Sequence, residues 1–300
     1  MTTTHFADRL NAATERVGAP VCVGLDPVLE RLPAAVIGDS PAQRLEAFCL
    51  GVIDAVAGTV AAVKPQLACF ERYGSKGWAA YERVVDRARE AGLIVIADAK
   101  RGDIGVSASH YAAALLDGDH PADAVTVSPY LGPDTLEPFV EKAAAQNAGL
   151  FVLVRTSNPG SDALQSLTLN DGRTVAMAVA DMVHQLGRPH VGDTGDSLVG
   201  AVVGATKATD AAALRAAMPE QVFLLPGYGA QGATADDARA CFHPSPSGRR
   251  VPRGAIVTAS RSVIYAFDAN HAAADWRGAI ADAAERFAGA VADAVCGALP

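Results

Sequence analysis

A chain of 300 residues, of which 50% are hydrophobic and 19% charged, can bury a large core, and this excludes wholesale disorder. Its formal net charge of −8 argues against a nucleic-acid surface, which needs clustered Lys and Arg; a small anionic ligand needs only a few local cations or backbone amides. The chain has no uncharged run long enough to cross a bilayer and no signal-peptide pattern at its start, so we expect no membrane association.

Five cysteines are spread along the chain, at Cys22, Cys49, Cys69, Cys241 and Cys296. Their number is odd and no Cys-x-x-Cys pair occurs, which is more typical of reduced thiols than of a disulfide framework or a zinc site. The seven histidines also lack the spacing of metal ligands. These patterns predict a cytoplasmic protein without a bound metal.

Eight short apolar runs are typical of buried strands. In chain order they cover residues 21–25, 61–63, 93–97, 124–127, 150–154, 198–203, 222–225 and 255–258. Most are separated by stretches with helical spacing, and this alternation indicates parallel strands joined by crossover helices.

Two of the intervening helices are especially clear. The first follows Ser40, a favourable N-cap residue, with Pro41 at the first helical position. Its apolar face consists of Leu45, Phe48, Cys49, Val52, Ile53 and Val56. The second is expected after Gly77, with an apolar side made of Tyr81, Val84, Val85 and Ala88.

Eight strand candidates predict an α/β protein that forms a single (β/α)8 TIM barrel over residues 1–300. The alternative is a doubly wound open sheet. Against it, the turn after the first strand, Gly24-Leu25-Asp26-Pro27, lacks the Gly-x-Gly-x-x-Gly spacing of a dinucleotide-binding fold.

Two segments extend this plan. Residues 160–197 are longer than a minimal connection, and we expect a hairpin-like turn at 167–175 and a helix near 175–186. Residues 243–252 are rich in Pro, Ser and Arg and predict an exposed loop.

Polar side chains collect where the predicted strands end. In chain order they are Asp26, Lys64, Asp98 with Lys100, Ser128, residues 156–158, Thr206 with Lys207, residues 227–231, and Ser260 with Arg261. In a barrel these ends share one rim, the rim that carries active sites. Each residue alone has an ordinary structural explanation, but their convergence predicts a functional site.

The third strand end carries the densest charge. Strand alternation would place Asp98 and Lys100 on one face, and Asp103 follows shortly after. Opposite charges at the end of a buried strand cost desolvation unless they pair. Taken alone, the cluster could also be a surface salt bridge with Asp103 capping the next helix.

The last two strand ends predict an anion site. Residues 226–232 form a glycine-rich turn that includes Gly229 and Gln231, and its backbone amides can approach a phosphate closely. Arg261 follows the eighth strand, where a guanidinium can hold a phosphate in a bidentate manner. In barrels the loops after strands seven and eight are the usual phosphate site.

At this point the chain resembles the orotidine 5′-phosphate decarboxylases, most closely their longer bacterial-type subgroup. The resemblance is carried by the Asp-Ala-Lys-Arg-Gly-Asp motif at 98–103, and it runs from about residue 20 to about residue 267. The supporting motifs occur in the family's order: residues 24–27, 63–66, 156–160, 226–232 and 260–262.

The resemblance implies a homodimeric barrel that converts orotidine 5′-phosphate to UMP in pyrimidine biosynthesis without metal or cofactor. It implies a catalytic network of Lys64, Asp98 and Lys100, with Lys100 as proton donor and Asp103 supplied to the partner subunit's site. For the substrate it implies that Asp26 binds a ribose hydroxyl, Ser157 the pyrimidine, and Gln231 and Arg261 the phosphate. Ser107 would lie near the ribose of the neighbouring site.

Two other functions stay open at the sequence level. A metal-dependent phosphosugar aldolase or decarboxylase of the same superfamily shares the Asp-x-Lys core, but the second lysine, Lys64, argues against it. A phosphate-binding barrel without activity would not need a costly array of buried charges.

Overall fold

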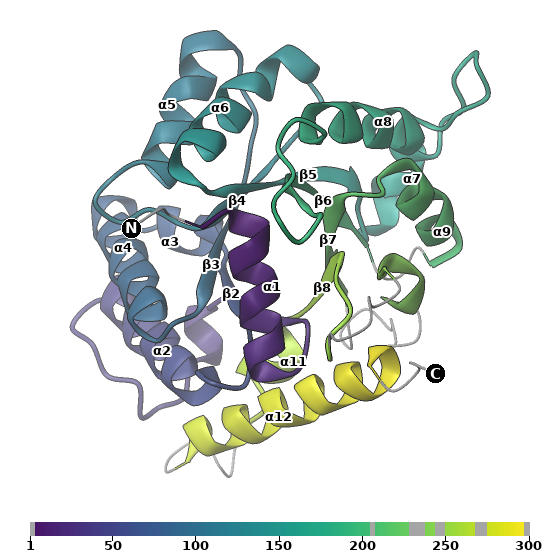
Figure 1. The fold of residues 1–300 in the computed structure, drawn as a ribbon. Helices are drawn as coiled ribbons and strands as arrows, with labels where there is room; N and C mark the ends of the chain where they lie inside the picture. The colour runs from purple at the N-terminus through teal and green to yellow at the C-terminus, as the bar shows by residue number, and fades with distance from the viewer. Residues whose placement is uncertain (1–3, 205–207, 228–237, 244–249, 268–274, 297–300) are drawn as a thin grey trace.

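The computed structural model describes residues 4–204, 208–227, 238–243, 250–267 and 275–296. Eight parallel strands close into a barrel in chain order, with β8 paired to β1 (Figure 1). The strands are β1 (Val21–Leu25), β2 (Ala62–Pro65), β3 (Ile94–Arg101), β4 (Ala124–Val127), β5 (Gly149–Arg155), β6 (Ser197–Val203), β7 (Gln221–Pro226) and β8 (Ala255–Ala259). The predicted (β/α)8 barrel is therefore confirmed, and the open doubly wound sheet is wrong.

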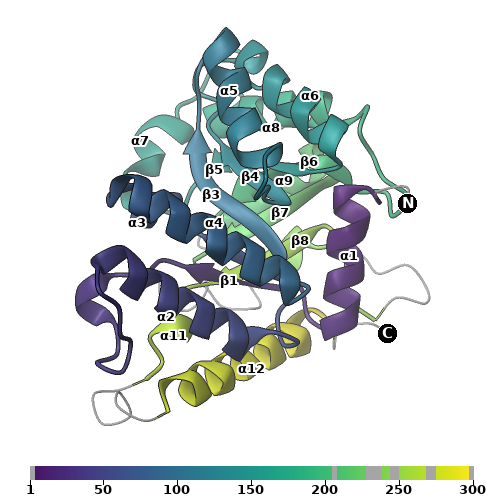
Figure 2. The same ribbon diagram turned by 90° about the vertical axis from the view of Figure 1, so that its left-hand side faces the viewer.

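Helices surround the barrel on its outside (Figure 2). The α-helices are α1 (Phe6–Val17), α2 (Pro41–Val56), α3 (Leu67–Glu71), α4 (Gly74–Glu90), α5 (Gly105–Leu116), α6 (Glu137–Gln146), α7 (Asp162–Gln165), α8 (Val175–Gly187), α9 (Ala208–Ala217), α11 (Arg261–Ile264) and α12 (Trp276–Val295). Short 3-10 turns lie at η1 (Leu29–Arg31), η2 (Pro133–Thr135), η3 (Pro159–Ser161) and η5 (Arg239–Cys241). Among the described residues, no helix combines the length and the apolar character that a membrane crossing requires.

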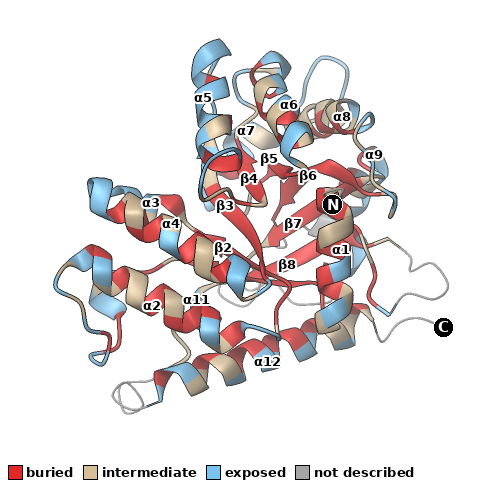
Figure 3. Ribbon diagram, turned by 60° about the vertical axis from the view of Figure 1, so that its left-hand side comes forward, coloured by how far each residue is buried: buried red, intermediate tan, exposed pale blue. Residues whose placement is uncertain are grey.

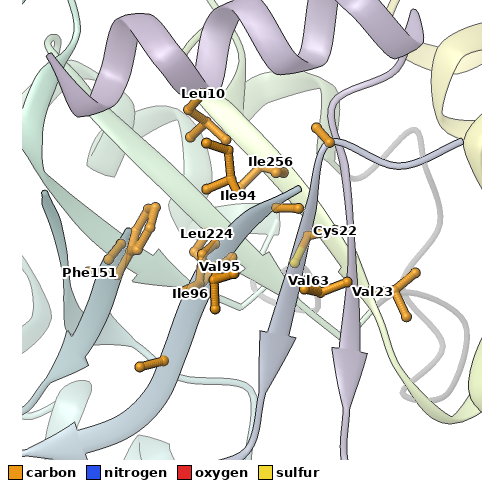
Figure 4. Packing of buried hydrophobic residues seen from close by; sticks show 14 of the residues in the cluster. Leu10, Cys22, Val23, Val63, Ile94, Val95, Ile96, Phe151, Leu224 and Ile256 are labelled. Atoms are coloured by element: carbon orange, nitrogen blue, oxygen red, sulfur yellow. The ribbon is translucent and has the colours of Figure 1, made fainter. Parts of the chain in front are cut away.

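The strands are apolar on both faces because one face fills the barrel and the other packs against the helices. Every residue of β1, β2, β4, β6 and β8 is buried (Figure 3). Side chains such as Val63, Ile96 and Leu224 come from different strands and belong to one continuous core (Figure 4). This packed core is the rigid support for the strand ends.

Helix α1 lies across the end of the barrel where the strands begin (Figure 1). Its Phe6 ring meets the Phe151 ring of β5 edge to face, with the ring centroids 6.0 Å apart. Gly149 leaves room for this contact, because a Cβ there would lie 2.3 Å from the Phe6 ring. The strand beginnings are thus covered by α1, and the carboxyl ends of the strands face away from it.

The two clearest helix predictions are confirmed, one with a shifted start. The hydroxyl of Ser40 accepts a hydrogen bond from the Gln43 N–H at 3.3 Å and caps α2 as expected. Helix α4 begins at Gly74, earlier than the expected start after Gly77. Gly77 lies inside the helix and does not mark its start. Glycine is needed there for close packing, because a Cβ at this position would lie 1.9 Å from the Phe70 carbonyl oxygen.

The two segments beyond the minimal barrel have defined contacts. Residues 167–175 form the expected turn, with an antiparallel bridge between Thr168 and Thr174, and α8 follows it. Of the exposed loop predicted at 243–252, residues 244–249 lie outside the described residues, and the prediction is wrong at the end of the loop because Val251 is fully buried. The Val251 N–H donates to the Glu15 side chain of α1 at 3.0 Å, which holds Val251 against α1.

Candidate functional site

A cavity of about 480 Å³ opens among the carboxyl ends of the strands, the expected place for a site in this architecture. Six residues with a predicted catalytic or binding role line it: Asp26, Lys64, Asp98, Lys100, Ser157 and Arg261, and so do Thr156, Asn158, Gly227 and Ser260 of the predicted rim. Asp103 and Ser107 are described but do not line it. Gly229 and Gln231, as well as Thr206 and Lys207, lie outside the described residues. Most of the predicted rim residues that the structure describes therefore surround one cavity.

A charged array lies inside this cavity, on β2 and β3. The Lys64 ammonium donates to Asp98 Oδ2 at 2.6 Å, and the Lys100 ammonium pairs with Asp98 Oδ1. The side chains of Lys64 and Asp98 are each only 8% exposed, whereas that of Lys100 is 47% exposed. The array is thus a buried ion pair with a second cation reaching toward the open part of the cavity.

The two lysines hold Asp98 ionised. Burial by itself would raise the pKa of Asp98, but the charges of Lys64 and Lys100 outweigh it and lower that pKa to about 2. For Lys64, burial would lower the pKa, and the nearby carboxylates of Asp98 and Asp26 raise it above its ordinary value instead. At neutral pH Asp98 and Lys64 therefore form a charged and almost fully buried pair.

The backbone of β3 explains how Asp98 and Lys100 come to face the same cavity. Their pairing was predicted from regular strand alternation, and the pairing is confirmed, but the backbone there is not regular. The register with β4 shifts between Ala97 and Arg101, and Lys100 has a φ of 48° in the left-handed region. A bulge in β3 therefore directs the Lys100 side chain into the cavity.

Asp26 stands at the end of β1, held from the neighbouring β8. The Ser260 hydroxyl lies 2.5 Å from Asp26 Oδ2 and 3.1 Å from the Gly24 carbonyl oxygen. The Tyr265 hydroxyl donates to the Asp26 carbonyl oxygen at 3.0 Å. Asp26 lines the cavity, and its Oδ1 is buried without a hydrogen-bond partner among the described residues.

The loop after β5 forms another wall and is held by the start of the extended connection. Gln165 of α7 accepts from the Thr156 N–H at 2.8 Å and donates to the Thr156 hydroxyl at 2.9 Å. The buried Arg155 anchors α7 through Asp162 and reaches Asp210 of α9 at 2.8 Å. The beginning of the 160–197 segment thus fixes the loop that carries Ser157.

The part of the cavity predicted to bind an anion lies partly outside the described residues. Arg261 is exposed, lines the cavity and begins α11, which is a single helical turn. Gly227 lines the cavity on the side of β7 and has a φ of 110°, which favours glycine. A guanidinium and a turn of this kind fit an anionic group at the mouth of the cavity.

Asp103 and Ser107 lie outside the cavity of their own chain. Asp103 Oδ1 accepts a hydrogen bond from the Ile104 N–H at 2.8 Å, just before α5 begins. Ser107 is exposed on α5. Both are therefore available to contact something outside this chain.

Sequence reasoning missed several polar residues of the cavity. On β4 it singled out Ser128, whereas the residue that lines the cavity is Thr126, inside the apolar run. Gln165 lines the cavity from the extended connection, whereas Gln66 of the 63–66 motif does not line it but donates to Asp98 Oδ2 at 3.2 Å. A lone threonine in an otherwise apolar strand was a signal for Thr126; nothing local marked Gln165, because its place depends on a long-range contact.

The arrangement offers fixed cations and hydrogen-bond donors but little for a metal. Both oxygens of Asp98 already contact lysine ammonium groups. Within the described ranges, no three His, Cys, Asp or Glu side chains converge in a way that would hold a metal ion. The chemistry that this site supports best is electrostatic stabilisation of charge and proton transfer from a lysine.

Comparison with known proteins agrees with this geometry. The model of the orotidine 5′-phosphate decarboxylase / HUMPS family matches residues 19–275. An orotidine 5′-phosphate decarboxylase of Rhodopirellula baltica is 47% identical over 274 residues, covering 87% of this chain and 88% of its own length. The Salinispora tropica enzyme of the same name is 44% identical, covering 87% and 90%.

Solved structures give the same result. The Leishmania donovani OMP decarboxylase is 32% identical, with a TM-score of 0.73 and coverage of 96% of this chain and 97% of its own. A Streptomyces avermitilis crystal structure, 38% identical, reaches a TM-score of 0.81 and covers 98% and 97%. The chain therefore belongs to the orotidine 5′-phosphate decarboxylase / HUMPS family, as a carboxy-lyase whose named relatives are orotidine 5′-phosphate decarboxylases.

Proposed function

We propose that the chain decarboxylates orotidine 5′-phosphate to UMP in pyrimidine biosynthesis, using the array of Lys64, Asp98 and Lys100. The observation that carries the proposal is this array, mostly buried, inside the cavity at the strand ends. The names of the relatives supply the substrate. Five free cysteines agree with a cytoplasmic location, which is part of the proposal.

We assign each part of this substrate to particular site residues. We assign a ribose hydroxyl to Asp26 and the phosphate to the exposed guanidinium of Arg261, and both residues line the cavity. Ser157 lies on the wall where the pyrimidine would sit. The family resemblance adds Gln231 and Gly229 to the phosphate site.

The reaction breaks the bond between pyrimidine C6 and the carboxylate carbon. Carbon dioxide leaves, and the electron pair stays on C6, in the ring plane, where no adjacent π-system delocalises it. The Lys100 ammonium next to C6 stabilises this charge and then donates its proton to C6. A fixed charge in a dry site outperforms water because it does not need to reorganise.

One cation does not account for the whole rate. At about 4 Å and an effective dielectric of about 20, one charge pair contributes about 4 kcal/mol, roughly three powers of ten in rate. Asp98 and Lys64 contribute by keeping Lys100 oriented. Asp98 also lies near the substrate carboxylate, and we rank its repulsion of the ground state below this preorganisation.

The proposed reaction is independent of metal, and a chelator assay tests this against the aldolase-like alternative. The enzyme is treated with a chelator, and loss of orotidine 5′-phosphate is followed with identification of UMP as product. Unchanged turnover is expected because the lysines supply the positive charge. Loss of activity that a divalent cation restores would favour the metal-dependent alternative, and no turnover in either sample would overturn the proposal.

We also propose a homodimer in which Asp103 enters the partner subunit's site. The surface around Asp103 is unusually apolar: Ile104 is 63% exposed and Val106 74%, while Tyr130, 77% exposed, follows β4. Gly102 and Ser128 bring the loops after β3 and β4 together, because a Cβ on Gly102 would lie 3.2 Å from Ser128. Exposed apolar surface of this kind is typical of an interface.

Subunit exchange tests the shared site. Homodimers of Asp103→Ala and of Lys100→Ala are each expected to be nearly inactive. Mixing them restores both groups in one of the two sites of a heterodimer, so part of the activity should return. If verified exchange restores nothing, Asp103 does not act across the interface.

A further inference from the structure

The backbone at Lys100 is in a conformation that a long side chain rarely adopts. Among the described residues other than glycine, only Lys100 and Asn147 have a positive φ. Asn147 is the C-cap of α6, a position where asparagine often adopts a positive φ. Lysine has no comparable preference for the left-handed region, so the residue type of Lys100 does not explain its φ. Such strain persists only where the surroundings hold it in place.

Thr126 lies directly opposite this strained segment. Ala97 pairs with Val125 and Arg101 pairs with Val127, so three residues of β3 stand against the single residue Thr126 of β4. The bulge removes the regular ladder at this point, and the Lys100 N–H needs another acceptor. The Thr126 hydroxyl accepts from the Lys100 N–H at 2.9 Å.

The same hydroxyl also contacts the catalytic carboxylate. Thr126 Oγ1 donates to Asp98 Oδ1 at 3.1 Å, the oxygen that pairs with the Lys100 ammonium. Thr126 is 2% exposed, so water does not readily replace these bonds. One hydroxyl thus links the backbone of Lys100 to the side chain of Asp98, using its lone pair for one and its proton for the other.

We propose that Thr126 is a positioning residue that holds the Lys100 ammonium against the reacting carbon by stabilising the left-handed backbone of Lys100 and the Asp98 carboxylate together. The inference rests on the proposed function, in which Lys100 is the proton donor. Loss of the hydroxyl would let the Lys100 ammonium move away from the reacting carbon while Asp26 and Arg261 still bind substrate. The rate of the chemical step would fall, and the affinity for substrate would not change.

The test compares Thr126→Val, which keeps the shape without the hydroxyl, with Thr126→Ser, which keeps the hydroxyl. For Thr126→Val we expect kcat to fall on the order of 10- to 100-fold, as for a small misplacement of a catalytic group, with KM within about twofold of wild type. Thr126→Ser should restore most of kcat. Thr14→Val, a buried threonine of α1 that donates to the Asn11 carbonyl oxygen far from the cavity, is the matched control and should leave kcat unchanged.

Each result has a separate meaning. If Lys100→Ala is inactive but Thr126→Val has wild-type kcat, the positioning role is wrong while the proposed function stands. If Lys100→Ala stays active, the proton donor itself is wrong. A parallel rise in KM, or failure of Thr126→Ser to restore kcat, would also overturn the positioning role; should Thr126→Val not fold, Thr126→Ala against Thr126→Ser gives the same comparison.

Discussion

Charged side chains are buried at both ends of the barrel, in very different surroundings. At the carboxyl ends of the strands, Lys64, Asp98 and Lys100 border a cavity of about 480 Å³. At the other end, Asp196 is completely buried just before β6. Its Oδ1 accepts from Arg253 at 2.6 Å, and its Oδ2 accepts from Asn11 of α1 at 2.9 Å.

The network of Asp196, Arg253 and Asn11, or lower network, holds separate parts of the fold together, whereas Lys64, Asp98 and Lys100 form the upper network. It joins α1, β6 and the segment before β8, which are far apart in the sequence. His243 completes it, with Nε2 3.3 Å from Arg215 and 3.7 Å from Asp196 Oδ1. Burial disfavours the charge of Asp196, and its pKa is raised despite the hydrogen bond from Asn11 and the nearby Arg253.

The comparison teaches that burial of charge does not itself identify a catalytic site. Both networks contain a nearly inaccessible carboxylate paired with at least one cation. The network of Lys64, Asp98 and Lys100 differs in having a half-exposed cation, Lys100, that lines a cavity together with Asp26. We therefore expect substitutions in the upper network to change rate, and substitutions in the lower one to change stability.

The largest expected effect is on rate. Lys100→Ala should lower kcat by about a thousandfold or more, because it removes both a stabilising charge and the proton. The unfolding midpoint should barely change, since the Lys100 side chain is 47% exposed and Asp98 keeps Lys64. Steady-state kinetics and urea unfolding on the same preparation measure both quantities; near-normal turnover would contradict the assignment.

The next effect is on stability. Arg253→Met leaves the buried Asp196 carboxylate without its guanidinium, and breaking such a pair costs about 3 to 5 kcal/mol of unfolding free energy. Activity per folded molecule should be unchanged, because Arg253 lies at the opposite end of the barrel from the cavity. Urea unfolding and active-site titration check this; an unchanged midpoint would show that the lower network does not stabilise the fold.

The smallest effect concerns pH. Burial, together with the positive charges of Arg215 and Arg253, lowers the pKa of His243 from 6.5 to about 4. Between these values the unfolded chain binds a proton that the folded chain does not, so stability falls as pH falls. From pH 7 to pH 5 the contribution is about 2 kcal/mol.

A paired measurement isolates this contribution from that of other groups. The unfolding free energies of wild type and His243→Gln are compared at pH 7 and at pH 5. The unfolding free energy of His243→Gln relative to that of wild type should rise by about 2 kcal/mol between pH 7 and pH 5. This difference between the two proteins is the gap to be measured. A gap that does not depend on pH would mean that His243 is not held neutral in the fold.

Much of the barrel could be predicted from the sequence because its strands are short, apolar on both faces and separated by helices with clear periodicity. The predicted runs at 21–25 and 124–127 match β1 and β4, and the other strands differ from their predictions by a few terminal residues. The polar residues after these runs predicted the rim because every parallel strand ends on the same side. Lys64, Asp98 and Lys100 therefore came together as expected.

What tertiary structure decided are the features that depend on contacts between distant segments. The bulge at Lys100 depends on the pairing of β3 with β4, and Thr126, not the predicted Ser128, lines the cavity from β4. Gln165 reaches the cavity through the anchoring of α7 by Arg155. Asp196 and His243 belong to no local motif, and they meet because the barrel closes and brings distant segments together next to α1.

The sequence by itself determined which residue types stand at the strand ends, because local periodicity specifies strands and helices. The tertiary structure decided which side chains meet there, because their contacts are long-range.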